Sequence, residues 1–423
     1  ALLFPVKSIA SVTAGINLLK WFALYLPLFF WIAKMAVERK VGWVRTPLDL
    51  PLLLYTLLVL SSLAYSIDPQ NTIDGIRGGY LKFVIVYLVV LHNFRTVEKL
   101  KRLATAFALS FLWLVAAGFY NYGMGDTSII GGLAALGNRH HNVVGMFMGG
   151  TFPFLLLLYD RDAPLINRAV SGGLIVLGLF AVFLTLSRGT WLGVLVSFLI
   201  WGRFQTGRVM LTLSTAFALL VFLFGPASIG QRAELLKHQA GTISGRTPIW
   251  RVAASLIKER PLLGYGYGPG IFTPIYEKER RFHEAPEANA PHEHNLFVAL
   301  LIQNGMVGLV LYLWILGGVV LLTFRTLCRL GTGPERELLI IVGSGVVGEY
   351  LVHALLERNH VGVWAIPFWA MMAITLVIHH RMHAGTAFSS FSSGPSGNPT
   401  EGSTALFPAE GSGRQEYSEP ERF

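Results

Sequence analysis

Apolar residues along the chain form long blocks that are separated by short polar stretches. Each block is roughly 18–22 residues long, the length that an α-helix needs to cross a hydrocarbon core about 30 Å thick. The pattern predicts an all-α polytopic membrane protein with about 11–12 transmembrane helices; the apolar start of the chain is either the remnant of a twelfth or an interfacial piece. The eleven clearer spans cover residues 16–36, 48–66, 79–94, 103–123, 142–160, 169–186, 189–206, 208–225, 305–326, 337–356 and 361–379.

The charge of the short connections predicts how these helices are oriented. Alternate connections are basic, and the positive-inside rule places basic connections in the cytoplasm. The basic ones are residues 37–45, 95–102 and 202–208 and the connection that holds Arg325, Arg329 and Arg336. The other side of the membrane then receives the polar turns GNRHHN (137–142), SRG (187–189) and ERNH (357–360) and the long segment 226–304.

Four parts follow from this layout. We predict N-terminal transmembrane helices over 1–225, a large and partly helical loop over 226–304, C-terminal transmembrane helices over 305–383 and a disordered cytoplasmic tail over 384–423. Loops of such length are uncommon and usually functional. Within this one, TPIWRVAASLIKE (247–259) has helical spacing of its apolar residues.

Composition agrees with a membrane protein and excludes other classes. The chain is 53% hydrophobic and 14% charged, whereas a soluble domain carries about 25% charged residues. The net charge of +10 is explained by basic cytoplasmic loops, so we expect the lipid bilayer and not nucleic acid as the partner. A single cysteine excludes an intrachain disulfide framework.

The stretch APHEHNLFVALLIQNGMVG (290–308) joins a polar cluster directly to an apolar helix. With Pro291 near the first helical position, His292 and His294 would lie in the first turn, where the helix dipole disfavours imidazolium. A histidine that is neutral at pH 7 can accept a proton, and Asn295 could bind substrate. The alternative is that both histidines are ordinary polar residues at a membrane surface.

Arg139, Arg188 and Arg246 are placed on the same side of the membrane as these histidines. Guanidinium groups stay charged and match phosphate oxygens. The three arginines therefore suggest a bound lipid diphosphate, and anchoring to lipid headgroups is the alternative.

Two further groups of residues have weaker functional interpretations. Tyr265 and Tyr267 in GYGYGPG could stack on sugar rings, or the segment could be a plain tight turn. Glu349 and His353 lie four residues apart within a span and share a helix face; they suit either a proton relay in a transporter or a buried structural pair.

A metal site at the histidines is an alternative to a role as proton acceptors. His292, Glu293 and His294 are close in sequence, but an HxH pair on a helix does not direct both rings to one face, and no HExxH or CxxC motif is present. We therefore expect neither a metal nor another cofactor.

The sequence HNLFVALLIQNGMVG fits a pattern of His–(Asn/Ser/Gln), nine residues, Gly, two residues and Gly/Thr/Tyr, here His294, Asn295, Gly305 and Gly308. Together with SRGTWLGV and GRTPIW…RPLLGYGYG in the same order upstream, it resembles the bacterial O-antigen ligases and the related O-antigen polymerases. The resemblance covers roughly residues 130–325.

This resemblance implies a membrane glycosyltransferase, similar to the C type and independent of metal, at the periplasmic face of the bacterial inner membrane. The donor would be an O-antigen glycan on undecaprenyl diphosphate and the acceptor lipid A–core oligosaccharide. By matching positions, His294 would be the base, and Arg188 and Arg246 would hold the diphosphate; Arg139 is added from the topology. Single displacement at the anomeric carbon would invert its configuration.

Two other functions stay open. Within the superfamily the alternative is an O-antigen polymerase. Outside it the alternative is a polytopic transporter or flippase, which fits the number of spans but predicts an internal inverted repeat that the sequence does not show.

Overall fold

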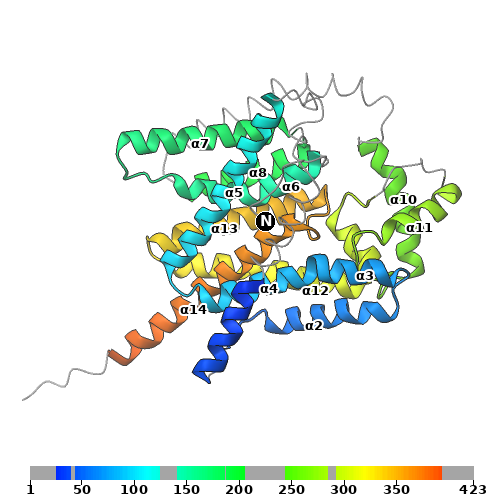
Figure 1. Ribbon diagram of the computed structural model, residues 1–423, viewed down its shortest axis with the longest axis horizontal. Helices are drawn as coiled ribbons and strands as arrows, with labels where there is room; N and C mark the ends of the chain where they lie inside the picture. Colours follow the sequence, from blue (N-terminus) through cyan, green and yellow to red (C-terminus); the bar gives the residue numbers. More distant parts are fainter. Residues whose placement is uncertain are drawn as a thin grey trace, which may run out of the picture. The chain divides into compact units, whose positions relative to one another are not determined.

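A computed structural model describes residues 25–39, 43–123, 141–185, 187–204, 243–283 and 292–392. Over these residues the chain is helical and contains no strand, which confirms the all-α prediction (Figure 1). The chain divides into two compact units, residues 1–382 and 383–423.

The helices are α2 (Asp49–Ser61), α3 (Pro69–Gly75), α4 (Leu81–Asn93), α5 (Val97–Gly123), α6 (His141–Leu155), α7 (Leu165–Leu184), α8 (Arg188–Phe204), α10 (Ile243–Glu259), α11 (Phe272–Glu279), α12 (Leu296–Arg329), α13 (Pro334–Val347) and α14 (Ile366–Ser392). A further helix covers residues 25–38. Short 3₁₀ or π-helical turns are η1 (Ser62–Ala64), η2 (Ile76–Tyr80), η5 (Leu156–Leu158), η6 (Arg280–His283), η7 (Gly348–Val352), η8 (His353–Leu355) and η9 (Val363–Ala365).

Each predicted span that the structure describes contains a helix, whereas the predicted span 208–225 lies outside the described residues. Among the described helices, four are long and apolar enough to cross a membrane: Val97–Tyr120, Leu165–Leu184, Leu296–Arg329 and Pro334–Leu355. Shorter apolar helices follow at Asp49–Ala64 and Asn142–Leu158. The protein is thus a polytopic helical membrane protein.

Helix α2 shows how the sequence suits this environment. Its exposed face carries Leu50, Leu53, Leu57 and Leu60, and its buried face carries Pro51, Leu52, Tyr55, Leu58 and Val59. A helix that is apolar all round is typical of a membrane span. The outer leucines therefore face lipid, and the inner residues pack against α12.

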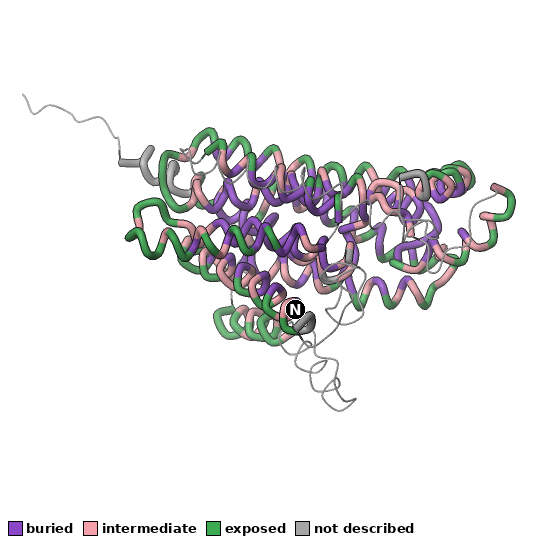
Figure 2. Tube along the Cα trace, turned by 90° about the horizontal axis from the view of Figure 1, so that it is seen from above, coloured by how far each residue is buried: buried purple, intermediate pink, exposed green. Residues whose placement is uncertain are grey.

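The interior is formed where the long helices meet. Helix α12 packs against α2 and α13, and α13 packs against α6 and α8. Buried residues are concentrated on the facing sides of the helices, with exposed residues on their outer sides (Figure 2).

Helix α12 begins earlier than its predicted span and is interrupted at Gly305, the tenth of its 34 residues. Residues 296–304, assigned to the long loop from sequence, form its first part. Gly305 has a φ of 63°, so the helical path is interrupted there. The loop after α10 enters the break: the Met306 N–H donates to Pro261 O over 2.8 Å, and the Tyr265 N–H donates to Ile302 O over 2.8 Å.

Two other helices extend beyond the boundaries that the sequence predicted. Helix α10 contains the predicted helix 247–259, and it packs with α11 beside α12 (Figure 1). Helix α14 continues to Ser392 and so includes residues 384–392, the first nine of the predicted tail; residues 393–423 lie outside the described part of the chain.

Candidate functional site

His294 and Asn295 lie directly before the first residue of α12, Leu296. The Asn295 side chain accepts hydrogen bonds from the backbone N–H groups of Phe297 and Val298 at 2.8 and 3.1 Å, which makes it the N-cap. Its amide nitrogen donates to Leu355 O at 3.0 Å. His294 therefore precedes the helix, and the prediction that it lies in the first helical turn was wrong.

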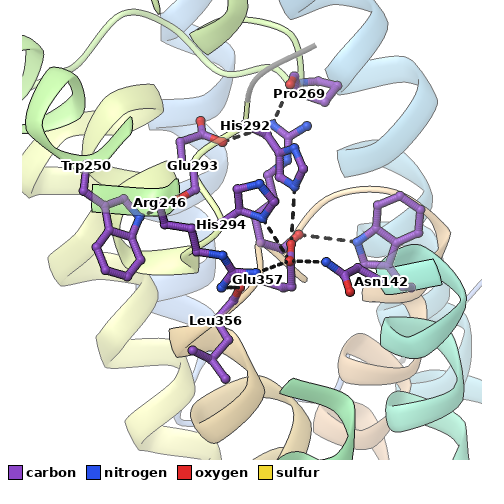
Figure 3. A network of polar contacts seen from close by, with 11 residues as sticks. Asn142, Arg246, Trp250, Pro269, His292, Glu293, His294, Leu356 and Glu357 are labelled. Atoms are coloured by element: carbon purple, nitrogen blue, oxygen red, sulfur yellow. Dashed lines mark hydrogen bonds and ion pairs between the residues drawn. The ribbon is translucent and has the colours of Figure 1, made fainter. Parts of the chain in front are cut away.

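The backbone of His294 is held in an uncommon conformation. Its φ is 49°, in the left-handed region, which costs a residue with a side chain roughly 1–2 kcal/mol. Such strain is often found at functional sites. Here the turn directs the His294 ring away from α12 and toward the connection that follows α13 (Figure 3).

The centre of the site is the carboxylate of Glu357, which is 1% exposed. Its Oε1 atom lies 2.9 Å from Nδ1 of His294, 3.0 Å from Nη2 of Arg246 and 2.7 Å from Nδ2 of Asn142. Arg246 also donates through Nη1 to the backbone oxygen of Leu356 at 2.8 Å. Figure 3 shows these side chains converging on Glu357 from separate segments.

His292 reaches the same carboxylate. Its Nε2 lies 3.4 Å from Glu357 Oε2, and its ring centroid lies 3.6 Å from that of His294. The expectation that the two rings cannot share a face was wrong, because both precede the helix.

This arrangement creates a group that could hold a metal ion. One ligand atom each from His292, His294 and Glu357 lie within 4.8 Å of one another. Oε1 of Glu357 already accepts hydrogen bonds from Arg246 and Asn142, whereas its Oε2 has no hydrogen-bond partner among the described residues; the charge of Arg246 beside the carboxylate opposes a second cation.

The charges of the site are set by burial and by these contacts. Burial lowers the pKa of His294, and the hydrogen bond to Glu357 offsets this only in part. Burial by itself would raise the pKa of Glu357, but its contacts with His292 and His294 hold it well below its usual value. The site thus combines a neutral imidazole at pH 7 with an ionised carboxylate that is paired to Arg246.

A second set of contacts fixes the segment that carries the histidines. Nη1 of Arg358 lies 3.2 Å from Oε2 of the buried Glu293 and donates to Pro269 O at 2.7 Å. The Trp250 indole donates to the backbone oxygen of Glu293 at 2.8 Å. Helix α10, the segment before α12 and the connection after α13 are therefore tied together at one place.

The remaining predicted site residues fall into three groups. Arg188 is the first residue of α8, is exposed, and lies near enough to Arg246 that its charge, after burial, helps to lower the Arg246 pKa. Arg139 lies outside the described residues. Tyr265 and Tyr267 are 4% and 2% exposed, so neither ring face is open to a sugar, and the structure favours the tight turn.

Glu349 and His353 share a face as predicted. Nδ1 of His353 lies 2.9 Å from Oε2 of Glu349, and both side chains are buried. The pair adjoins the Glu357 segment, because the N–H of Glu357 donates to the backbone oxygen of His353 at 3.1 Å.

Sequence reasoning missed Glu357 and Asn142. The available signal was the predicted topology, which placed ERNH (357–360) and GNRHHN (137–142) on the same side of the membrane as His294. A contact between residues 63 positions apart is not encoded in local spacing.

Comparison with known proteins agrees with the motifs. A family model described as O-antigen ligase matches residues 173–313, a range that includes Arg188, Arg246 and His294. The chain is 26% identical over 329 residues to an O-antigen ligase of Salmonella typhimurium (strain LT2), covering 73% of this chain and 76% of the relative. It is 23% identical over 391 residues to the exopolysaccharide production protein ExoQ of Rhizobium meliloti (strain 1021), covering 88% of this chain and 85% of the relative. These matches agree with the resemblance found from the motifs and support a relationship to the O-antigen ligase superfamily.

Proposed function

We propose that the protein is an O-antigen ligase: a glycosyltransferase that moves an O-antigen glycan from undecaprenyl diphosphate to lipid A–core oligosaccharide at the periplasmic face of the bacterial inner membrane. The observation that carries the proposal is the direct contact of His294, Arg246 and Glu357 in one buried cluster. In this cluster His294 would act as the neutral base and Arg246 as the cation that binds phosphate.

The bond changes of the reaction define what the site must supply. The acceptor hydroxyl attacks the anomeric carbon, the bond from that carbon to the diphosphate oxygen breaks, and the hydroxyl proton passes to a base. Diphosphate is a good leaving group, so charge stabilisation at its oxygens is the main requirement. The exposed Arg188 is suited to bind phosphate oxygens in a forked geometry. The two Nη atoms of Arg246 already donate to Leu356 and Glu357, so Arg246 is suited to contribute positive charge beside the diphosphate.

His294 is suited to the role of base. Its Nδ1 is bonded to Glu357, which favours the tautomer with the proton on Nδ1 and leaves Nε2 to accept the proton of the acceptor hydroxyl. Glu357 also carries the ion pair with Arg246 at 3.0 Å. The carboxylate thus couples the base to the cation that binds the donor.

A second candidate function is polymerisation of a lipid-linked glycan. It is favoured by the relative named as an exopolysaccharide production protein, which aligns with 88% of this chain. The same residues would serve, because only the acceptor differs.

A genetic experiment distinguishes the two. The gene is deleted in its own O-antigen-producing host, and lipopolysaccharide is separated on a gel. Loss of a ligase leaves bare core and accumulates lipid-linked polymer, and this is the expected result. Loss of a polymerase leaves core with one repeat unit, and that result would favour the second candidate.

A further inference from the structure

The loop that follows α10 presents two leucines on the protein surface. Leu262 and Leu263 are 65% and 45% exposed, and the neighbouring Pro261 is also exposed. An exposed apolar cluster of this kind marks contact with lipid or with another molecule. The residues around Leu262 and Leu263 indicate that lipid is the contact.

The leucines are exposed because the backbone on both sides of them is fixed. The N–H groups of Met306 and Val307 donate to the backbone oxygens of Pro261 and Leu262 at 2.8 and 3.2 Å. On the other side, the N–H of Gly266 donates to the Gln303 oxygen at 3.0 Å. The loop is thereby held in the break of α12 with its two leucine side chains directed outward.

The exposed leucines are continuous with the lipid-facing side of α12. Met306 and Val307, which bond to the loop, are 48% and 39% exposed. The exposed apolar row continues along α12 through Val310, Leu313, Trp314, Leu321 and Phe324. Because α12 is apolar and long enough to span a membrane, this row faces acyl chains, and Leu262 lies beside its first members.

Charged residues border the leucines on one side. Lys258, Glu259 and Arg260 are exposed at the end of α10, so two of these three charged residues are cationic, and the Arg260 guanidinium lies 4.9 Å from the centre of the Tyr265 ring. Apolar side chains bordered by cations are typical of segments that enter the interfacial region of a bilayer. Lys258 and Arg260 then lie at the level of the lipid phosphates.

We propose that residues 261–263 insert into the bilayer interface next to Met306 and Val307 and act as a membrane anchor for α10. Helix α10 has 17 residues, and Arg246 lies near its other end. The anchor therefore fixes the helix that carries Arg246 relative to the membrane surface. This assignment does not depend on the reaction that the protein performs.

The test measures lipid contact directly. Cys328 is the single cysteine and is exposed, so a Cys328→Ser full-length chain provides the background. Single cysteines are introduced by Leu262→Cys, by Val310→Cys as the lipid-facing control and by Lys278→Cys as an exposed control on α11. Each is labelled with the fluorophore NBD and placed in phosphatidylcholine nanodiscs that contain lipid with a nitroxide on acyl carbon 5.

The expected result is that the nitroxide lipid reduces NBD fluorescence at least about twofold at positions 262 and 310 and much less at 278. Quenching at 262 no stronger than at 278 would overturn the proposal. So would a label at 262 that is shielded from aqueous iodide but not quenched by the lipid, because it would indicate a protein contact. Leu263→Cys repeats the measurement should the label at 262 disturb the loop.

Discussion

Nδ1 of His294 lies 2.9 Å from Oε1 of Glu357, although the two residues are 63 positions apart in the sequence. Arg246 contacts the same oxygen at 3.0 Å. A single buried carboxylate therefore orients the proposed base and neutralises the proposed diphosphate-binding cation. The predictions below follow from this shared contact and from the break in α12.

Glu357→Gln should lower kcat for glycan transfer by about 100-fold, since the neutral amide no longer selects the Nδ1-protonated tautomer of His294. A role limited to holding Arg246 would instead raise the KM for the donor and leave kcat nearly unchanged. Steady-state kinetics of the purified protein in nanodiscs separate the two outcomes.

A matched control for that variant is Glu349→Gln. It removes a second buried carboxylate that contacts a histidine Nδ1 at the same distance of 2.9 Å, but its side-chain partners are His353 and Asn359, not His294 or Arg246. Its kcat should stay within about threefold of the wild-type value. An equal loss of kcat in both variants would show that the effect of Glu357→Gln is not specific to the base.

The pH dependence of transfer should reflect the environment of His294. His294 is faced by Glu357 and His292 and by the guanidinium of Arg246 from α10, and burial together with the latter two lowers its pKa. A base with a lowered pKa stays neutral to lower pH, so the acid limb of the kcat/KM profile, which reports the free enzyme, should lie below pH 6.5, the ordinary histidine value. Removing Glu357, whose hydrogen bond raises the pKa, should move that limb to still lower pH. A limb above pH 7 would contradict this account.

Arg246→Ala should destabilise the fold as well as weaken donor binding. It leaves the buried Glu357 carboxylate without its cation, and breaking a buried ion pair in this way costs roughly 3–5 kcal/mol. Arg246→Lys keeps the charge but cannot bond both Glu357 and the Leu356 backbone, so it should give an intermediate loss. Thermal unfolding in detergent checks the order, and equal melting temperatures for all three proteins would count against the buried pair.

Gly305→Ala should destabilise the protein by more than about 1 kcal/mol, because an added Cβ would meet the backbone oxygen of Leu262 at 2.2 Å and the φ of 63° is unfavourable for alanine. Gly317→Ala is the control: it lies in the same helix with no atom within 4 Å of the new Cβ, and it should be neutral or stabilising by roughly 0.5–1 kcal/mol. Equal melting temperatures for the two variants would argue against the break in α12.

The sequence predicted the helical architecture well because membrane spans are encoded by local hydropathy. Short motifs also predicted His294 and Arg246 as site residues, and both contact the same oxygen of Glu357. Glu357 could not be assigned in the same way, because its proposed role depends on contact with His294. That residue precedes α12, whereas Glu357 lies in the connection after α13. The tyrosines of GYGYGPG allowed two interpretations from sequence, because the burial of a side chain depends on tertiary packing. In the structure Tyr265 lies against α12 just before its break, and its hydroxyl donates to Glu259 at 2.9 Å.

The most direct test of the central claim is the rate of glycan transfer by wild-type protein and by His294→Asn, which keeps a residue type that tolerates the left-handed backbone of position 294. Both are reconstituted with undecaprenyl-diphosphate-linked glycan and lipid A–core acceptor, with EDTA present throughout. The account predicts that wild-type protein transfers glycan in EDTA and that kcat of His294→Asn is lower by roughly 10²–10⁴-fold. Transfer by His294→Asn at the wild-type rate, or loss of wild-type transfer in EDTA, would contradict it.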